Sequence, residues 1–278
     1  MDDACFVVAR LATYATLLLA AGVPLYLTAA RERGAWRLSG GVTLAAMAAS
    51  AWWVLEAIAS MAGQPVGQID PEMAFAVLDA TPLGMVMVVR LVALLAALAA
   101  LWRCNMGLAA LAASVALATM AWTGHAGAGE GGTGALHRAS DVVHLLAASI
   151  WTGALTLFSG AAISSQDRET LLRRLSAFAT IGSAIVVLLL LTGIANTLAI
   201  AGWPIDLAST WTWLLGAKLA LFLGMLALAV FNRWLLTPRL ARDPTGNLGY
   251  LKLSLALETG AAFLILAIVS WLGVLSPS

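Results

Sequence analysis

The dominant feature of this sequence is a series of long apolar runs separated by short connections, a pattern that suits a lipid bilayer better than water. Hydrophobic residues make up 62% of the 278 residues and charged residues only 10%, whereas a soluble domain carries about 25% charged residues. A transmembrane helix needs roughly 20 mostly apolar residues. The composition therefore predicts a polytopic membrane protein with almost no soluble part.

The apolar runs divide into about eight predicted transmembrane spans. Because irregular backbone cannot face lipid, each run is expected to be a helix. The predicted fold class is therefore all-α, with one integral-membrane helical domain over residues 1–278. Proline and glycine occur in several of the connections, where helix breakers belong. The predicted spans cover about 4–30, 38–62, 81–102, 105–123, 136–161, 174–201, 210–236 and 250–275.

The positions of the charged residues predict how the spans are oriented. Basic residues fall in the first, third, fifth and seventh connections: Arg31, Arg33, Arg37, Arg103, Arg168, Arg173, Arg174, Arg233, Arg239, Arg242 and Lys252. Arg138 is the one basic residue in the opposite set of connections, where acidic residues accumulate. By the positive-inside rule the basic connections are cytoplasmic, and both termini are extracytoplasmic. The net charge of +1 gives no reason to expect a nucleic-acid partner.

All three histidines lie close together, around the extracytoplasmic connection between the fourth and fifth predicted spans. His125 follows the fourth span within a glycine-rich stretch. His137 and His144 are seven residues apart in the fifth span, so they share a helix face with Asp141, and Trp151 continues that face inward. Imidazole binds copper, zinc and iron, and a carboxylate can orient it.

The spacing of the two helical histidines limits how they can bind metal. Seven residues on a helix span about 10 Å along the axis, so one ion does not easily bridge His137 and His144. Either each histidine works with ligands from other helices, or the two are successive stations along an entry path. A histidine at the headgroup level can also be a simple surface residue. His144 lies deeper, beside Asp141, where polar groups are costly and usually functional.

Sulfur-bearing side chains at a similar predicted depth extend the candidate metal site. They are Cys5, Met61, Met85 and Met120. Thiolate and thioether ligands favour Cu(I). Methionine also fills gaps in helical cores, so a packing role remains open for each of them.

Four further ionisable residues lie well inside predicted spans: Glu56, Arg90, Lys218 and Glu258. A charge at such a position is expensive unless it is paired or hydrated. We expect Glu258 to pair with Lys218 or Arg90 across helices. The pair would be either a clamp between helices or part of a polar pathway, since a buried ion pair can simply fix packing.

Several of these stretches resemble one family of bacterial inner-membrane proteins. The "GHA" at 124–126 and "SDVVHLLAASIWTGAL" at 140–155 are similar to motifs of the copper resistance protein D (CopD) family. The matching positions are Gly124, His125, Asp141, His144, Trp151 and Gly153. The resemblance continues through "ATPLGMVMVVR" at 80–90, "RRLSAFATIGSAIVVLLLLTGIANT" at 173–197, "STWTWLLGAKLALFLGMLALAVFNR" at 209–233 and "LALETGAAFLILAI" at 255–268.

The resemblance implies copper handling at the bacterial inner membrane, usually uptake into the cytoplasm alongside a periplasmic copper-binding partner of the CopC type. The cargo it implies is copper, as Cu(I) or Cu(II). It does not identify the ligands. Relatives often carry tyrosine or phenylalanine where this chain has Leu215, just before the glycine of the seventh span.

Three functions remain open from the sequence. The first is a copper-binding inner-membrane protein that accepts copper at the periplasmic face and imports it. Sulfur ligands on the inner side are then limited to Met47, Met87, Met106, Met225 and Cys104. The second is a b-type haem electron carrier, with His125 and His144 as the axial pair. The third is a metal-free scaffold that docks a periplasmic partner.

Enzymatic activity is not expected. The sequence has no hydrolytic triad signature, HExxH, phosphate-binding loop or dinucleotide fingerprint. It also has no large ATPase domain, so any transport would be driven by a gradient or by handover between proteins. The oligomeric state is left open.

Overall fold

The computed structural model describes residues 3–124, 131–164, 168–202, 206–243 and 248–275. Within these ranges the chain folds into helices without strands, and seven helices are long and apolar enough to cross a membrane. The predicted all-α polytopic fold is confirmed. The helices are α1 (Asp3–Ala29), α2 (Trp36–Ala62), α3 (Pro71–Ala80), α4 (Pro82–Trp102), α5 (Met106–Ala118), α6 (Gly131–Ile163), α7 (Arg168–Ala201), α8 (Thr210–Phe231), α9 (Thr237–Arg242) and α10 (Gly249–Leu272).

The fourth predicted span, 105–123, is shorter than the others. It consists of α5 and a tighter 3₁₀ turn over Thr119–Trp122, which together cover Met106–Trp122. The turn is anchored from α4, because Arg90 donates to the Thr119 hydroxyl at 2.8 Å and to the Met120 sulfur at 3.2 Å. This anchor fixes the end of α5 just before Gly124.

A helix that the sequence analysis treated as a connection lies between α2 and α4. This helix, α3, begins after Asp70, whose carboxylate accepts from the Met73 amide at 2.7 Å. Pro71 occupies the first helical turn, where a missing N–H does no harm. The Asp-Pro pair was the sequence signal for this helix start.

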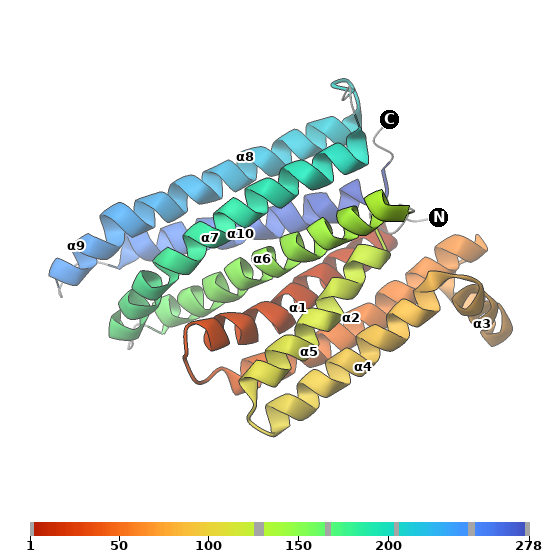
Figure 1. Cartoon of the computed structure of the whole chain (residues 1–278), viewed down its shortest axis with the longest axis horizontal. Helices are drawn as coiled ribbons and strands as arrows, with labels where there is room; N and C mark the ends of the chain where they lie inside the picture. Colours follow the sequence, from red (N-terminus) through yellow and green to blue (C-terminus); the bar gives the residue numbers. More distant parts are fainter. Residues whose placement is uncertain (1–2, 125–130, 165–167, 203–205, 244–247, 276–278) are drawn as a thin grey trace.

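The bundle has two halves that meet along α1 and α6 (Figure 1). Helices α2, α4 and α5 lie on one side of α1, and α7, α8 and α10 lie on the other side with α6. The central pair approaches closely, since a Cβ on Gly153 would collide with the backbone of Gly22, and a Cβ on Gly22 with that of Ser149. Small residues permit such contact between membrane helices.

The second half is packed more openly than the first. Helix α7 packs on α6 and α8 packs on α10, whereas α7 and α8 make at most a marginal contact along the described residues. Within an apolar stretch of 18 residues, only 11% of the residues of α7 and 6% of those of the segment Thr210–Arg242, which contains α8, are buried. The space between these helices holds the cavities described below.

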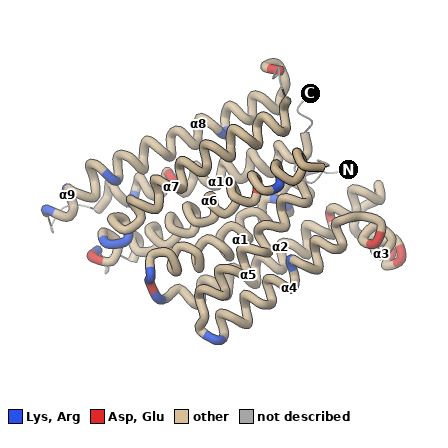
Figure 2. The backbone as a smooth tube through the Cα atoms, viewed as in Figure 1, with Lys and Arg blue, Asp and Glu red and all other residues tan. Residues whose placement is uncertain are grey.

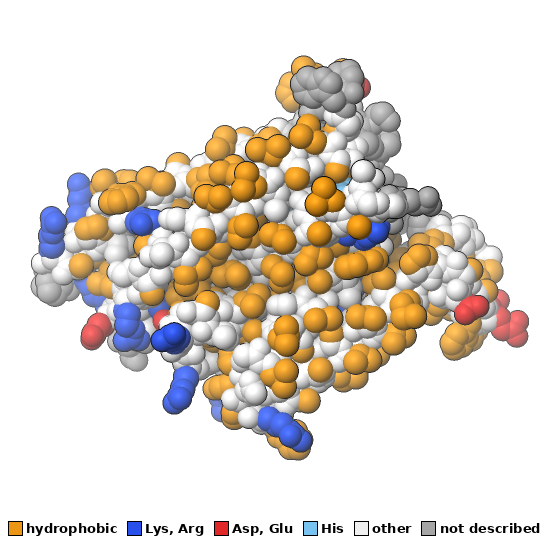
Figure 3. Space-filling model, in the orientation of Figure 1, with side chains coloured by type: hydrophobic (Ala, Val, Ile, Leu, Met, Phe, Trp, Pro, Cys, Tyr) orange, Lys and Arg blue, Asp and Glu red, His pale blue; other side chains and the backbone are white. Residues whose placement is uncertain are grey.

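The ends of the bundle differ in charge. Lys and Arg residues gather at the end opposite the two termini, and acidic residues mark α3 near the terminal end (Figure 2). Hydrophobic side chains cover the middle of the visible face (Figure 3). The orientation prediction likewise places the basic connections on one side of the membrane and both termini on the other. We therefore call the end with the termini the outer end and the basic end the inner end.

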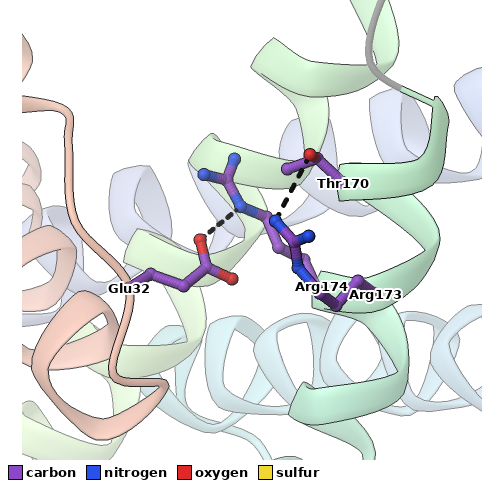
Figure 4. Close-up of polar contacts among 4 residues, drawn as sticks. All are labelled: Glu32, Thr170, Arg173 and Arg174. Atoms are coloured by element: carbon purple, nitrogen blue, oxygen red, sulfur yellow. Dashed lines mark hydrogen bonds and ion pairs between the residues drawn. The ribbon is translucent and has the colours of Figure 1, made fainter.

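An ion pair ties the two halves together at the inner end. Glu32, just after α1, lies with Oε2 2.7 Å from Nε of Arg174 in α7, and the neighbouring Arg173 donates to the Thr170 hydroxyl (Figure 4). Both partners of the pair are largely shielded, with side chains 17% and 14% exposed for Arg174 and Glu32.

Candidate functional site

Three cavities follow one another through the second half of the bundle, from the outer to the inner end. The outer cavity, about 180 Å³, is lined by His137, Asp141 and His144 among others. The middle cavity, about 300 Å³, shares His144 with the outer one and is otherwise mostly apolar. The inner cavity, about 370 Å³, shares Trp151 with the middle one. Shared wall residues place the three cavities next to one another in a series.

His144 is held in one tautomer by a hydroxyl on α7. Its Nδ1 lies 2.9 Å from Oγ1 of Thr192. The Thr192 hydroxyl donates its own hydrogen to the Leu188 carbonyl at 2.5 Å, so Oγ1 is left to accept from Nδ1–H. The lone pair of the imidazole is therefore on Nε2, in a ring that lines both the outer and the middle cavity. This is the form of histidine that binds a metal ion.

A second polar contact joins α6 and α7 at this level. The Asn196 amide donates to Oδ1 of Asp141 at 3.3 Å, while the Asn196 amide oxygen is buried without a hydrogen-bond partner. Asp141 also acts electrostatically on Lys218 of α8. The carboxylate predicted to orient a histidine thus links α6 to α7 and α8, and Thr192 takes the orienting role at His144.

Arg10 of α1 also lines the outer cavity, and the sequence analysis missed it. The residue is only 7% exposed. Its Nη1 donates to the Gly273 carbonyl at 3.0 Å, and its guanidinium carbon lies 5.7 Å from the ring centroid of Tyr14. A basic residue inside the first apolar run was the available signal. With Lys218, two cationic side chains share this cavity with one carboxylate.

Sequence comparison agrees with this architecture. The chain is 32% identical to "Copper resistance protein D" of Pseudomonas syringae pv. tomato, in an alignment that covers 100% of this chain and 98% of that protein. The chain belongs to the copper resistance protein D family. Its residues 172–272 match the family model for copper resistance protein D, and residues 1–135 match the model for the copper resistance protein D-like N-terminal domain.

A second relative supports the location of this family member. "Inner membrane protein YebZ" of Escherichia coli (strain K12) is 31% identical over 57% of this chain and 55% of its own length. Together with the apolar helices, these relatives show a multi-pass inner-membrane protein related to copper resistance. No solved structure matches the chain.

The predicted sulfur ligands, Cys5, Met61, Met85 and Met120, lie away from the three cavities. Cys5 is exposed, and Met61 and Met85 are 58% and 71% exposed on the outside of the bundle. Met120 is buried and accepts from Arg90. His125 lies outside the described residues.

The expected pairing of Glu258 with Lys218 or Arg90 is wrong. Glu258 instead accepts from the Asn232 amide at 2.5 Å in the inner cavity. Lys218 lines the outer and middle cavities, and Arg90 lies in the other half of the bundle, 5.3 Å from the ring centroid of Trp53. The reason is register: α8 and α10 run antiparallel, and Lys218 and Glu258 each lie in the first half of their helix, so they face the outer and the inner cavity respectively.

Glu56, the fourth ionisable residue predicted inside a span, accepts from the Trp52 indole at 3.0 Å within α2, away from the cavities. Among the described residues, no group of three or more histidine, cysteine, aspartate or glutamate side chains is arranged to hold a metal ion. A metal passing His144 would therefore take ligands of other kinds, or from several levels. Met225 of α8 qualifies, because it is 5% exposed and lines the middle cavity.

Proposed function

We propose that this protein accepts copper at the periplasmic face and passes it inward as Cu(I) along the three cavities. The observation that carries the proposal is the state of His144, whose Nδ1 is engaged by Thr192 and whose Nε2 is left with its lone pair in the wall of two cavities. A neutral, oriented imidazole is a suitable first ligand for copper.

The path offers ligands in a reasonable order for a soft cation. His137 lines only the outer cavity, His144 lines the outer and middle cavities, and Met225 supplies a thioether to the middle one. Imidazole and thioether both suit Cu(I), and several stations in sequence let the ion move on from the first one. Trp151 then separates the middle from the inner cavity.

The proposal also names the protein that delivers copper and assigns this chain a carrier role. We propose that a periplasmic copper-binding protein of the CopC type delivers the metal at the outer end, where His137 and the acidic α3 lie. The protein then acts as a carrier rather than an enzyme, and copper is its cargo.

A competition titration with a Cu(I) chelator on the detergent-purified protein tests binding. We expect one tight equivalent for the wild type, and loss of that equivalent in His144→Ala. Failure of both proteins to compete would refute the copper site. A Soret band in the purified protein would instead favour the haem-carrier alternative.

Transport is tested separately in proteoliposomes that contain a trapped Cu(I) chelator. Met225→Leu conserves volume and removes only the thioether. We expect it to keep the tight equivalent in the titration and to slow copper uptake. Wild-type uptake no faster than in protein-free vesicles would leave a binding protein and exclude import.

A further inference from the structure

The inner cavity contains a buried carboxyl group that the proposed copper stations do not use. Glu258 of α10 is 4% exposed and Asn232 is 5% exposed. Asn232 is the first residue of a π-helical turn, Asn232–Leu236, that follows α8. Such turns are rare and frequently mark functional sites. The Asn232 amide donates to Oε1 of Glu258 at 2.5 Å.

Among the residues that the structure describes, no cation forms an ion pair with this carboxyl group. Arg233 also lines the cavity, but its guanidinium donates to the Ala179 carbonyl at 2.7 Å and the Ser183 hydroxyl at 2.8 Å, and it lies over the Trp234 ring.

The other elements around Glu258 add no charge to the cavity wall. Helix α6 contributes apolar side chains, and so does α7 apart from Ser183. Tyr26 of α1 does not line this cavity and packs against the rings of two residues in its wall, Phe158 and Phe178. A carboxylate in such surroundings is expensive, and binding a proton removes its charge.

The neighbouring amide suits both protonation states of the carboxyl group. As the structure stands, Nδ2 of Asn232 donates to Oε1 of Glu258, an arrangement that suits the carboxylate, and Oδ1 of Asn232 is buried without a donor. A half-turn of the amide would present Oδ1 instead, and Oδ1 accepts a hydrogen bond from a carboxylic acid O–H. Asn232 therefore keeps one hydrogen bond to Glu258 whether or not the proton is present.

We propose that Glu258 and Asn232 form a proton-binding site in the inner cavity, and that this proton leaves as Cu(I) arrives. The first half concerns the protein alone, and the second half rests on the proposed function. A cation close to a carboxyl group favours the ionised form of that group, so copper and the proton compete for one negative charge. The arriving Cu(I) displaces the proton from a carboxyl oxygen to cytoplasmic water, the carboxylate compensates the copper charge, and the proton returns once copper has left.

Infrared difference spectroscopy during a pH titration tests the proton site without copper. The purified wild-type protein is expected to show a carboxylic acid C=O band that disappears as pH rises and that is absent in Glu258→Gln. The matched control is Glu56→Gln, which removes a half-buried carboxyl group at the other end of the bundle and keeps the band. A wild-type protein without a titrating band, or a band that persists in Glu258→Gln, overturns the site.

Asn232→Ala provides a second variant if Glu258→Gln does not fold. Loss of the amide partner should shift the frequency of the C=O band, and an unshifted band would exclude Asn232 from the site.

Copper uptake at different internal pH values tests the exchange. One pH unit below the titration midpoint, about a tenth of the carboxyl groups are ionised. We therefore expect wild-type uptake at that internal pH to be about tenfold slower than at an internal pH well above the midpoint, where nearly all are ionised. Uptake by Glu258→Gln should be insensitive to internal pH. Uptake that ignores internal pH in the wild type overturns the exchange. A titrating band in a protein that transports no copper at any pH overturns the proposed function and leaves the proton site standing.

Discussion

Thr192→Val tests whether one hydroxyl on α7 sets the copper affinity of His144. Valine keeps the branched shape of threonine and replaces the hydroxyl by a methyl group. The His144 Nδ1–H then loses its acceptor, which lies at 2.9 Å in the structure. The ring must either leave this N–H unpaired or change tautomer, and the change of tautomer would place a hydrogen on Nε2, the atom proposed to meet copper.

The expected loss follows from the role of this contact. Removing the partner that orients a metal-binding histidine typically weakens metal affinity about 10- to 100-fold, which corresponds to about 1.4–2.8 kcal/mol. The range agrees with the roughly 1–3 kcal/mol that a buried unpaired hydrogen-bonding group costs. The valine side chain has no hydrogen-bond acceptor, so no rotation of it restores the hydrogen bond that the Thr192 hydroxyl accepts from His144 Nδ1.

The assay is the Cu(I) competition titration, with two matched comparisons. Thr197→Val removes a hydroxyl that also lines the outer and middle cavities but bonds to the Gly193 carbonyl at 2.8 Å, so its affinity should equal that of the wild type. Thr192→Ser keeps the hydroxyl and should retain most of the affinity. Wild-type affinity in Thr192→Val, beside a loss in His144→Ala, would refute the argument that Thr192 fixes the ring.

Two further changes have defined outcomes. Lys218→Gln removes a cation from the wall shared with His144, and repulsion on the order of 1 kcal/mol between charges in one cavity predicts Cu(I) affinity about fivefold tighter in the same titration; unchanged affinity would mean that Lys218 does not repel the bound ion. Gly153→Ala forces a methyl group against the backbone of Gly22 and should destabilise the bundle by about 1–3 kcal/mol, seen as a lower Tm in detergent, whereas Gly160→Ala, with open space around its Cα, should not. A wild-type Tm for Gly153→Ala would show that α1 and α6 separate freely.

Most of the fold could be predicted because the bilayer imposes both length and polarity on each span. The first predicted span, 4–30, is α1 (Asp3–Ala29), and the last, 250–275, is α10 (Gly249–Leu272). Helix α3 was missed because it lies outside the apolar runs, where hydropathy gives no guide and only the Asp70 cap marks its start.

Within one helix, spacing correctly predicted which side chains share a face. His137, Asp141 and His144 do line one cavity, because residues three, four and seven apart share a helix face. The partners on other helices were not predictable, since they depend on which helices are neighbours and on their relative register. Thr192 is one of many threonines in apolar spans, and nothing in its local sequence marks it as the residue opposite His144.

Register also explains why the charges inside the spans were paired wrongly. Both Lys218 and Glu258 lie well inside their predicted spans, and this position suggested an ion pair. The antiparallel course of α8 and α10 instead separates them toward opposite ends. The separation gives the proposed path two different chemistries, with candidate nitrogen and sulfur ligands in its outer and middle parts and the Glu258–Asn232 pair in its inner part. A soft cation that binds imidazole and thioether groups has little affinity for the oxygen atoms of Glu258. The inner carboxyl group therefore suits charge compensation of a passing ion better than tight binding of it.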